Sequence, residues 1–400
     1  MRAPTVRIGF ARQAPMARCC LSGASPIRRT TGPTAKGYLK RKEGREEAYF
    51  RPNDWWEEQR IELLTRTTVR ALDLGSRTAT LSSNEEVSFD RALLATGANV
   101  RRLNVEGCEL DRIYYLRTLG NADAILAGVE DAEEVVVIGG SYIGCEVAAS
   151  LTLIGKRCTI VMQEQKTLER SFGARAGNFF QELLESHGVT VHGGDELERF
   201  AGESRVSKVI TRGGLQLAAD AVVVGAGVTP DVQLARSAGL TIGELGGVRC
   251  SARLESSTTG VFAAGDICEY DAPVHGGAPV RIEHWDVAFN QGKTAALNML
   301  GNAVPHEEVP YFFSDLADWG GFEYVGPAYQ WDEEIVRGSM DDGSFTNWYL
   351  QDGVVKGALA VGRSDDLEHA RRLIVDGSPL ADSAKSRLAD PSADLGGVLL

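Results

Sequence analysis

The stretch that decides the fold is VVVIGGSYIGCEVAAS, from Val135 to Ser150. Its first four residues are β-branched and predict a buried strand, and a helical pattern follows the glycines. Gly139, Ser141 and Gly144 occupy the three positions of a G-x-G-x-x-G turn, with serine in the middle. Such a turn reverses the chain tightly, lets a pyrophosphate approach the backbone and lets the helix pack on its strand, while free helix N–H groups face the phosphates. We therefore predict a dinucleotide site lined by Gly139, Gly140, Ser141, Tyr142, Ile143 and Gly144.

The residues beyond the second predicted strand bear on the choice of nucleotide. Glu164 lies about twenty residues past Gly144, where an acid binds the ribose diol of NAD. The end of the strand itself reads Met162-Gln163, and Lys166 is close enough to favour a 2′-phosphate. The sequence favours NAD(H) over NADP(H) and leaves both open.

Composition limits the classes of function. A chain of 400 residues with 43% hydrophobic content can bury more than one core, so we expect two or three domains. It has 42 basic and 55 acidic residues, a net charge of −13, which disfavours nucleic acid and anionic membranes as partners. No apolar run is long enough to span a bilayer.

The seven cysteines are scattered and form no CxxC pair. Cys19 and Cys20 are adjacent and receive no role. The other five lie in or beside apolar runs, where we expect buried thiols: Cys108, Cys145, Cys158, Cys250 and Cys268. This usage predicts a reducing compartment, the cytoplasm, and no ligand spacing for a metal, haem or iron–sulfur cluster is present.

The order of predicted elements indicates an α/β fold. Residues 118–247 alternate strands and helices around a hairpin at Gly213-Gly214, which predicts a parallel sheet with covering helices. Two more buried strands end on Thr96-Gly97 and on Gly265-Asp266. Near the C-terminus, Asp352-Gly353 predicts a hairpin, and a helix follows whose Asp365 and Glu368 are spaced as a capping box.

Residues 1–33 differ from the rest. They hold six arginines and no acid, but Pro4 and Pro15 would interrupt an amphipathic helix. A disordered or mis-specified N-terminus is favoured over an organelle transit peptide.

Seven motifs occur in order: KGYL, LLATGA, VVVIGGSYIGCEVAASL, GAGVTPD, GVFAAGDI, EHWDVAFNQGKTAA and VPYFFSD. Together they resemble the FAD-dependent pyridine nucleotide reductases, specifically the ferredoxin reductase and apoptosis-inducing-factor-like branch, over residues 34–377. The resemblance implies two Rossmann-like dinucleotide-binding domains, with the FAD domain split by the NAD domain, and a C-terminal α+β domain. The expected limits are 34–117 and 248–307 for FAD, 118–247 for NAD(P), 308–377 for the C-terminal domain and 378–400 for a flexible tail.

The resemblance also implies roles for individual residues. The Asp266 carboxylate would bond the flavin ribityl chain beside Gly265. Lys36 and Glu146 match a pair near flavin N5, where a cation stabilises the reduced ring and a carboxylate orients that cation. The remaining expected cofactor contacts are Thr96, Gly97, Gly227, His284 and Trp285. Simpler interpretations are a solvated Glu146, an Asp266 that caps a turn and a Trp285 in an ordinary core.

The family begins with a further strand–GxGxxG–helix for the ADP half of FAD. Residues 1–33 contain Gly9, Gly23 and Gly32 but no such unit, so the sequence predicts an FAD domain truncated at its N-terminus. Three lost hydrogen bonds to a pyrophosphate, at about 1.5–3 kcal/mol each, would weaken FAD binding by roughly 5–9 kcal/mol.

The expected function follows from the resemblance: an NAD(P)H-dependent flavin oxidoreductase that passes electrons from NADH through FAD to a ferredoxin-like iron–sulfur protein. The alternative is a truncated, FAD-deficient relative that retains NAD(P) binding and is not catalytic. Because ferredoxins are usually acidic, Arg363, Arg371 and Arg372 are candidates for a docking patch. We expect a monomer or a homodimer that binds neither DNA nor membranes.

Overall fold

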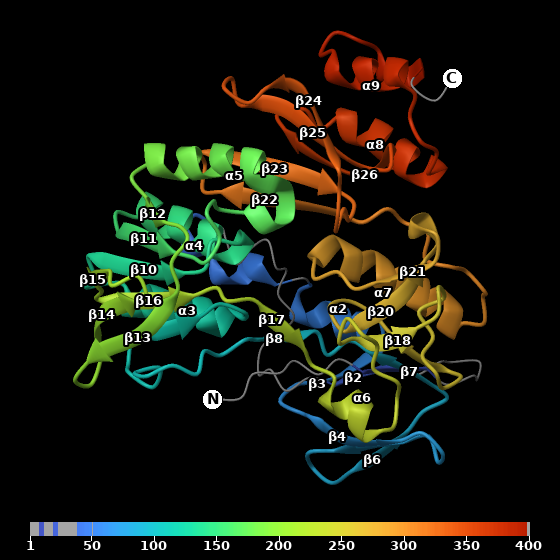
Figure 1. Cartoon of the computed structure of the whole chain (residues 1–400). Coiled ribbons are helices and arrows are strands. Elements are labelled where there is room, and N and C mark those ends of the chain that lie inside the picture. The colour runs from blue at the N-terminus through green and yellow to red at the C-terminus, as the bar shows by residue number, and fades with distance from the viewer. Residues whose placement is uncertain (1–7, 12–18, 23–37, 50, 398–400) are drawn as a thin grey trace. The chain divides into compact units, whose positions relative to one another are not determined.

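The computed structural model describes residues 8–11, 19–22, 38–49 and 51–397 (Figure 1). The chain divides into two compact units, each formed by segments distant in sequence. The first comprises Tyr49–Asn99 and Val228–Pro310 with the described part of Met1–Thr31, and the second comprises the described part of Gly32–Ala48, then Val100–Gly227 and Tyr311–Leu400.

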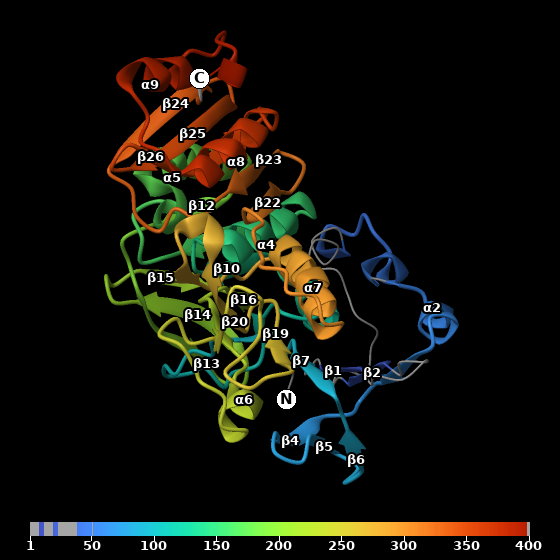
Figure 2. The same ribbon diagram turned by 90° about the vertical axis from the view of Figure 1, so that its right-hand side faces the viewer.

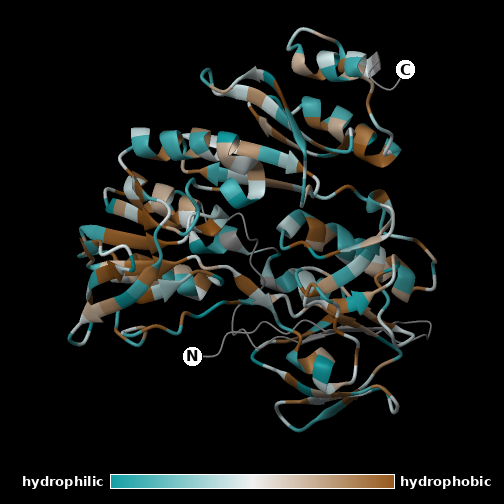
Figure 3. Cartoon of the chain, in the orientation of Figure 1, coloured by the Kyte–Doolittle hydropathy of each residue, from teal (hydrophilic) through white to brown (hydrophobic). Residues whose placement is uncertain are grey.

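The second unit contains a five-stranded sheet in which every neighbouring pair is parallel. Its order is β12 (Thr190–His192), β11 (Arg157–Val161), β10 (Glu134–Ile138), β16 (Ala221–Val224) and β9 (Ile113–Tyr115). The chain runs from β10 outward to β11 and β12 and then returns to β16 on the other side of β10. The central strands are buried along almost their whole length and brown in Figure 3, as expected for a sheet covered on both faces.

Three helices accompany this sheet: α3 (Leu119–Gly128), α4 (Tyr142–Leu153) and α5 (Glu169–Ser186). The predicted strand and helix around the glycine turn are therefore confirmed. Helix α5 is interrupted near its start, where the non-helical Gly173 (φ 80°) joins a short first turn to the main helix. The predicted hairpin at Gly213-Gly214 is also present. The chain between β12 and β16 forms three antiparallel strands: β13 (Leu197–Gly202), β14 (Val206–Thr211) and β15 (Gln216–Ala218).

The C-terminal part of the second unit is an antiparallel sheet. Its order is β22 (Tyr311–Leu316), β23 (Gly320–Val325), β26 (Val354–Val361), β25 (Ser344–Gln351) and β24 (Glu333–Ser339). Asp352 and Gly353 both have positive φ between β25 and β26, which confirms the predicted tight hairpin. Aromatic rings join this sheet to α4 and α5: Phe312 contacts Tyr142 and Phe172 at centroid distances of 5.3 and 6.2 Å.

The structure departs from the sequence predictions after this sheet. In α8 (Asp366–Asp376) the capping box is not formed, because Asp365 has helical dihedrals rather than the extended conformation that a capping side chain needs. The expected loose tail contains α9 (Asp382–Ala389) and the short turn η3 (Leu395–Gly397). The buried guanidinium of Arg337 holds this tail through the carbonyls of Arg387, Asp390 and Ala393, and sequence periodicity carries no sign of such contacts.

The first unit is built around β19 (Val261–Ala263) and β7 (Arg91–Leu94), which pair in parallel. Helix α7 (Trp285–Met299) packs on both strands (Figure 2). The same sheet continues through β1 (Ile8–Ala11), β2 (Cys19–Ser22) and β3 (Ile61–Leu64), with β1 antiparallel to β7. The first two of these strands are the described part of residues 1–33.

Smaller elements complete the first unit. They are α2 (Asn53–Glu58), α6 (Gln233–Ser237), η2 (Pro273–His275), the sheet β4 (Val69–Asp73), β5 (Thr78–Leu81) and β6 (Glu86–Ser88), the sheet β18 (Val248–Cys250), β20 (Cys268–Ala272) and β21 (Ala278–Val280), and the pair β8 (Ala98–Val100) and β17 (Val228–Pro230). The short turn η1 (Arg45–Ala48) belongs to the second unit. Along the chain, β9 is the first strand of the parallel sheet.

The predicted fold class is confirmed: an α/β chain with parallel Rossmann-like cores and a C-terminal antiparallel sheet. Of the five cysteines that we predicted to be buried thiols, four are buried and free, and Cys108 is half-buried. None of the described helices is long and apolar enough to cross a membrane. The domain limits and the cytoplasmic location stay predictions.

Burial of His306 gives the first unit a pH dependence. Its ring is 2% exposed and hydrogen-bonds Thr294 Oγ1 at 3.1 Å, and burial lowers its pKa from 6.5 to about 4. The unfolded chain therefore binds more protons than the folded chain between pH 4 and 6.5, so stability falls on acidification through this window. Between pH 7 and 5 the loss amounts to about 2 kcal/mol.

We expect His306→Gln to lose less stability than the wild type between pH 7 and 5, measured as the change in thermal midpoint. The exposed His187 provides the matched control substitution, His187→Gln. An unchanged slope in His306→Gln would contradict the assignment.

Candidate active site

The dinucleotide turn lies at the point where the parallel sheet reverses its strand order. The loops after β10 and β16 meet there: the N–H of Gly225 donates to the carbonyl of Ile138 at 2.8 Å. In open α/β sheets a ligand binds in the crevice at this switch point, beyond the carboxyl ends of the strands. Gly227 lies on the second of these loops, two residues past Gly225.

Close backbone contacts explain the glycines of the turn. A Cβ on Gly139, which has φ 107°, would lie 2.6 Å from the carbonyl oxygen of Gly225. A Cβ on Gly144 would lie 1.9 Å from the carbonyl oxygen of Gly139, and one on Gly140 would lie 2.0 Å from Sδ of Met162. Because these neighbours are mostly backbone, a side chain at either outer position would force the turn open.

The start of α4 supplies donors for an anion. The N–H groups of Tyr142, Ile143 and Gly144 fall in the first helical turn, where no intrahelical acceptor exists. Ser141, the exposed N-cap, makes no side-chain capping bond in the described part of the chain. The turn therefore leaves backbone donors and the positive end of the helix dipole for phosphates.

The end of β11 carries no acid. Met162 follows this strand directly, and its side chain is 3% exposed because it packs beneath Gly140. Glu164 is two residues further on and half-buried, and its carbonyl accepts the N–H of Gly194 at 2.9 Å. Lys166 is also half-buried. The loop after β11 thus carries one carboxylate and one ammonium.

The predicted flavin-binding turns lie together in the first unit. The N–H of Ala264, after β19, donates to the carbonyl of Leu94 in β7 at 3.1 Å, so Thr96-Gly97 and Gly265-Asp266 follow paired strand ends. Thr96 Oγ1 donates to the carbonyl of Asp231 at 2.6 Å. Asp266 is 9% exposed, and the interpretation that it caps a turn stays open.

Helix α7 orders the second of these turns. Gln291, which is fully buried, accepts the N–H of Gly265 through Oε1 at 2.7 Å. His284 is the N-cap, and its Nδ1 accepts the N–H of Asp286 at 3.3 Å. Trp285 is half-buried and stacks on Phe289 at 5.4 Å, and the choice between ordinary core and cofactor contact stays open.

Glu146 is enclosed between α4 and the C-terminal sheet. Its carboxylate is 8% exposed and accepts a hydrogen bond from the hydroxyl of Ser314 on β22. The interpretation of a solvated Glu146 is therefore wrong, because packing of β22 on α4 covers this face of the helix. Lys36, its expected partner, lies outside the described residues.

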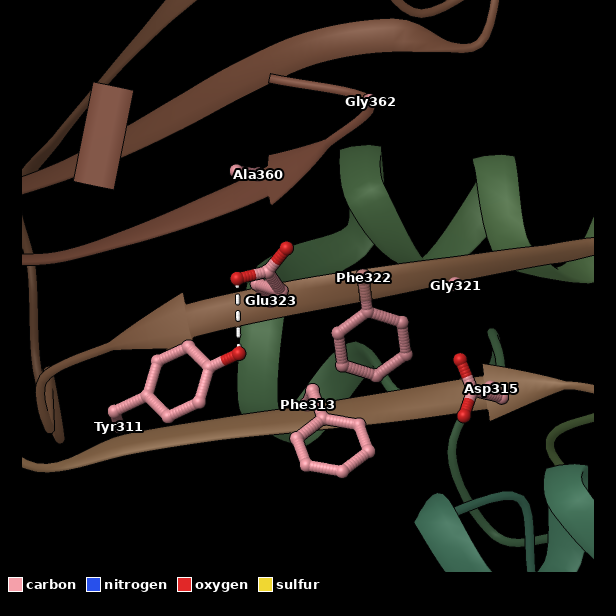
Figure 4. Close-up of a pocket in the computed structure, with 8 residues that line it drawn as sticks. All are labelled: Tyr311, Phe313, Asp315, Gly321, Phe322, Glu323, Ala360 and Gly362. Carbon is pink, nitrogen blue, oxygen red and sulfur yellow. Dashed lines mark hydrogen bonds between the residues drawn. The ribbon is translucent and has the colours of Figure 1, made fainter. Parts of the chain in front are cut away.

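The opposite face of β22 lines a shallow pocket of about 340 Å³ (Figure 4). Alternation along the strand separates the two faces: Tyr311, Phe313 and Asp315 line the pocket, while Phe312 and Ser314 face α4 and α5. Glu323 accepts a hydrogen bond from the Tyr311 hydroxyl at 2.9 Å. The described residues contain no cluster of His, Cys, Asp and Glu able to hold a metal ion.

Sequence reasoning did not select two residues that the structure places at these sites, Ser314 and Gln291. Both lie inside quoted motifs, VPYFFSD and EHWDVAFNQGKTAA. In the sequence each is only a polar residue within a quoted motif, and the fold reveals its partner.

The turn geometry generates a prediction at Gly144. In Gly144→Ala the new Cβ must displace the Gly139 carbonyl, and the loss of two hydrogen bonds to phosphate should weaken NADH binding about 100-fold or more. Titration calorimetry measures this affinity. Gly120→Ala provides the matched control, because its Cβ in the first turn of α3 would meet its nearest atom at an ordinary 3.8 Å. Equal NADH affinity in both variants would contradict the assignment.

Comparisons with known proteins agree with this geometry. The pyridine nucleotide-disulphide oxidoreductase family model matches residues 5–292, and the reductase C-terminal model matches residues 311–399. The chain is 31% identical to the 5,5′-dehydrodivanillate O-demethylase ferredoxin reductase subunit of Sphingobium sp., with 94% of this chain and 90% of the relative covered. It is 32% identical to the anthranilate 1,2-dioxygenase system ferredoxin–NAD(+) reductase component of Burkholderia cepacia, with 98% and 92% covered.

Among solved structures, the covalent putidaredoxin reductase–putidaredoxin complex matches with a TM-score of 0.88 and 30% identity, covering 95% of this chain and 91% of that chain. The family match spans both units and the buried turns that carry the predicted cofactor contacts. The chain therefore belongs to the pyridine nucleotide-disulphide oxidoreductase family, in its ferredoxin reductase branch.

Proposed function

We propose that this protein is an FAD-dependent NADH oxidoreductase that delivers electrons to a ferredoxin-like iron–sulfur protein. The observation that carries the proposal is the switch-point turn at Gly139–Gly144, joined in one chain to the Gly265-Asp266 turn. The relatives named above are ferredoxin reductase components, which supports the same class of electron acceptor. Within the described residues no CxxC pair offers a thiol acceptor.

The described residues fit the flavin half of FAD. Gly265 has φ 78°, and a Cβ there would lie 3.3 Å from the Cβ of Ala288, so glycine lets this turn pack closely on α7 next to Asp266. Bound FAD would supply the step from a two-electron hydride donor to a one-electron acceptor. Asp266 would hold its ribityl chain, and Thr96, Gly97, His284 and Trp285 would line its path. The strand–GxGxxG–helix unit that would hold the adenosine half is the one that the sequence of residues 1–33 lacks, and most of these residues lie outside the described part of the chain.

Glu146 would act from the nicotinamide side. Its carboxylate would anchor the Lys36 ammonium near flavin N5, and the cation would stabilise negative charge there. The buried position of Glu146 supports this role, because an enclosed carboxylate interacts with a nearby cation more strongly than a solvated one.

For the nucleotide we propose NAD(H) as the preferred cofactor, with Glu164 on the ribose diol. The acid Glu164 is not at the strand end, where Met162 is buried, but two residues further on. Its contact with the ribose therefore depends on the conformation of the loop after β11. NADP(H) would be the weaker substrate, and Lys166 on the same loop is the residue that would favour its 2′-phosphate.

One of the three candidate docking arginines, Arg363, is engaged in an internal ion pair. Arg363 Nε donates to the buried Asp366 at 2.9 Å, so its charge serves an internal ion pair. Arg371 lies over the Tyr311 ring at 5.1 Å, and Arg372 is exposed beside His369. We therefore propose Arg371 and Arg372, without Arg363, as the basic contacts for an acidic partner.

The purified full chain tests the proposed function directly. We expect a yellow protein whose flavin band near 450 nm bleaches with NADH and recovers when a ferredoxin is added. Absorption spectroscopy under anaerobic conditions provides the measurement. A colourless protein that still binds NADH, even after reconstitution with FAD, would establish the FAD-deficient alternative instead.

The nucleotide preference rests on Glu164. Glu164→Ala should lower kcat/KM for NADH about tenfold, the value of one charge-assisted hydrogen bond, and leave that for NADPH within about twofold. Steady-state kinetics with both nucleotides measures the ratio. Gln163→Ala, one residue away and exposed, is the control and should leave the ratio unchanged.

A further inference from the structure

The hydrogen bond between Ser314 and Glu146 links parts of the chain that are 168 residues apart. Ser314 is 2% exposed and Glu146 is 8% exposed, so both ends of the bond are enclosed. One group belongs to the nucleotide-binding helix α4 and the other to the C-terminal sheet. The C-terminal sheet therefore contacts directly the carboxylate that we place in the redox machinery.

Burial makes this bond matter for the charge of Glu146. A carboxylate removed from water is destabilised unless donors replace its hydration, and a hydroxyl that donates to the ionised form favours that form. Ser314 supplies such a donor from a strand, whose backbone is fixed by pairing with β23. A hydrogen bond in an enclosed site is also stronger than one in water.

Three described side chains near the bond, those of Phe312, Tyr142 and Cys145, are apolar or neutral. Phe312, two residues before Ser314, packs its ring on Tyr142 at 5.3 Å. Burial raises the pKa of the Tyr142 hydroxyl and of the Cys145 thiol well above their ordinary values, so both groups stay neutral near physiological pH. Of the titratable side chains on α4 named here, Glu146 is the one whose hydrogen bond to Ser314 the structure describes.

We propose that Ser314 is a positioning residue for the redox reaction: its hydroxyl fixes the Glu146 carboxylate and keeps it ionised. The inference rests on the proposed function, in which Glu146 anchors the cation beside the flavin. It assigns to the C-terminal sheet a role in tuning hydride transfer, in addition to covering α4.

Three variants of the full-length, FAD-loaded protein test the proposal. Ser314→Ala removes the donor, and Ser314→Thr restores a hydroxyl at the same position. The matched control is Ser150→Ala: Ser150 is 1% exposed and also bonds Glu146, but it donates to the main-chain carbonyl at 2.6 Å. Both alanine variants therefore remove a buried hydroxyl that is hydrogen-bonded to Glu146. Only Ser314→Ala removes a hydrogen bond to its carboxylate.

Two readouts separate positioning from folding. The first is the rate at which NADH bleaches the flavin band in rapid mixing, measured from pH 5 to 9. The second needs no turnover: the pH titration of the oxidised flavin spectrum, which responds to the charge of a nearby carboxylate. Thermal unfolding at one pH records any general loss of structure.

We expect Ser314→Ala to slow flavin reduction about tenfold and to move both pH midpoints up by about one unit, since loss of a donor raises a carboxyl pKa. Ser314→Thr should return the rate and the midpoints to within about twofold and a few tenths of a unit, and Ser150→Ala should leave them at wild-type values. Wild-type rates and midpoints in Ser314→Ala, or equal changes in Ser150→Ala, would overturn the proposal.

The proposed function and this inference fail in different ways. If NADH does not reduce the wild-type flavin, the proposed function is overturned and the inference with it. If the wild type is reduced normally and Ser314→Ala is unaltered, only the inference is overturned. If Ser314→Ala does not fold, Ser314→Cys takes its place, because a thiol is nearly isosteric with the hydroxyl and is a weaker donor. Its two pH midpoints should move up by less than those expected for Ser314→Ala. Wild-type midpoints in Ser314→Cys would overturn the proposal.

Discussion

The contact between two loops, after β10 and after β16, is the constraint on which the nucleotide-binding part depends. The carbonyl of Gly225 occupies the space that a side chain on Gly139 would need, and the Gly139 carbonyl does the same to Gly144. Only glycine permits both approaches. Their result is a helix that starts directly at the switch point of the sheet, with its backbone donors directed to the crevice where a pyrophosphate would bind.

Helix α4 connects that turn to the chemistry proposed for Glu146. One turn beyond its donors, the helix presents this carboxylate to β22, and the rings of Tyr142, Phe172 and Phe312 exclude water around it. Aromatic packing joins the C-terminal sheet to α4 and α5, and the Ser314–Glu146 hydrogen bond lies within this contact. The same packing that stabilises the second unit thus sets the environment of a functional group.

In the first unit, side-chain hydrogen bonds hold the turns that carry the predicted cofactor contacts. Its turns after β7 and β19 are each held by a side-chain hydrogen bond: Thr96 Oγ1 donates to the Asp231 carbonyl, and Gln291 Oε1 accepts the Gly265 N–H next to Asp266. Precise placement of that kind is what a bound cofactor requires, since an error of 1 Å at the reacting atoms lowers the rate severely.

Local sequence determined the elements themselves: the buried strands, the glycine turn, the hairpin at Asp352-Gly353 and the α/β class follow from periodicity and turn chemistry, which act over a few residues. Tertiary structure decided what those elements enclose. The burial of Glu146, the bond from Ser314, the engagement of Arg363 with Asp366 and the ordered α9 held by Arg337 all join residues from separate elements or loops. Such contacts leave no periodic trace in the sequence, because they depend on which faces the completed fold brings together.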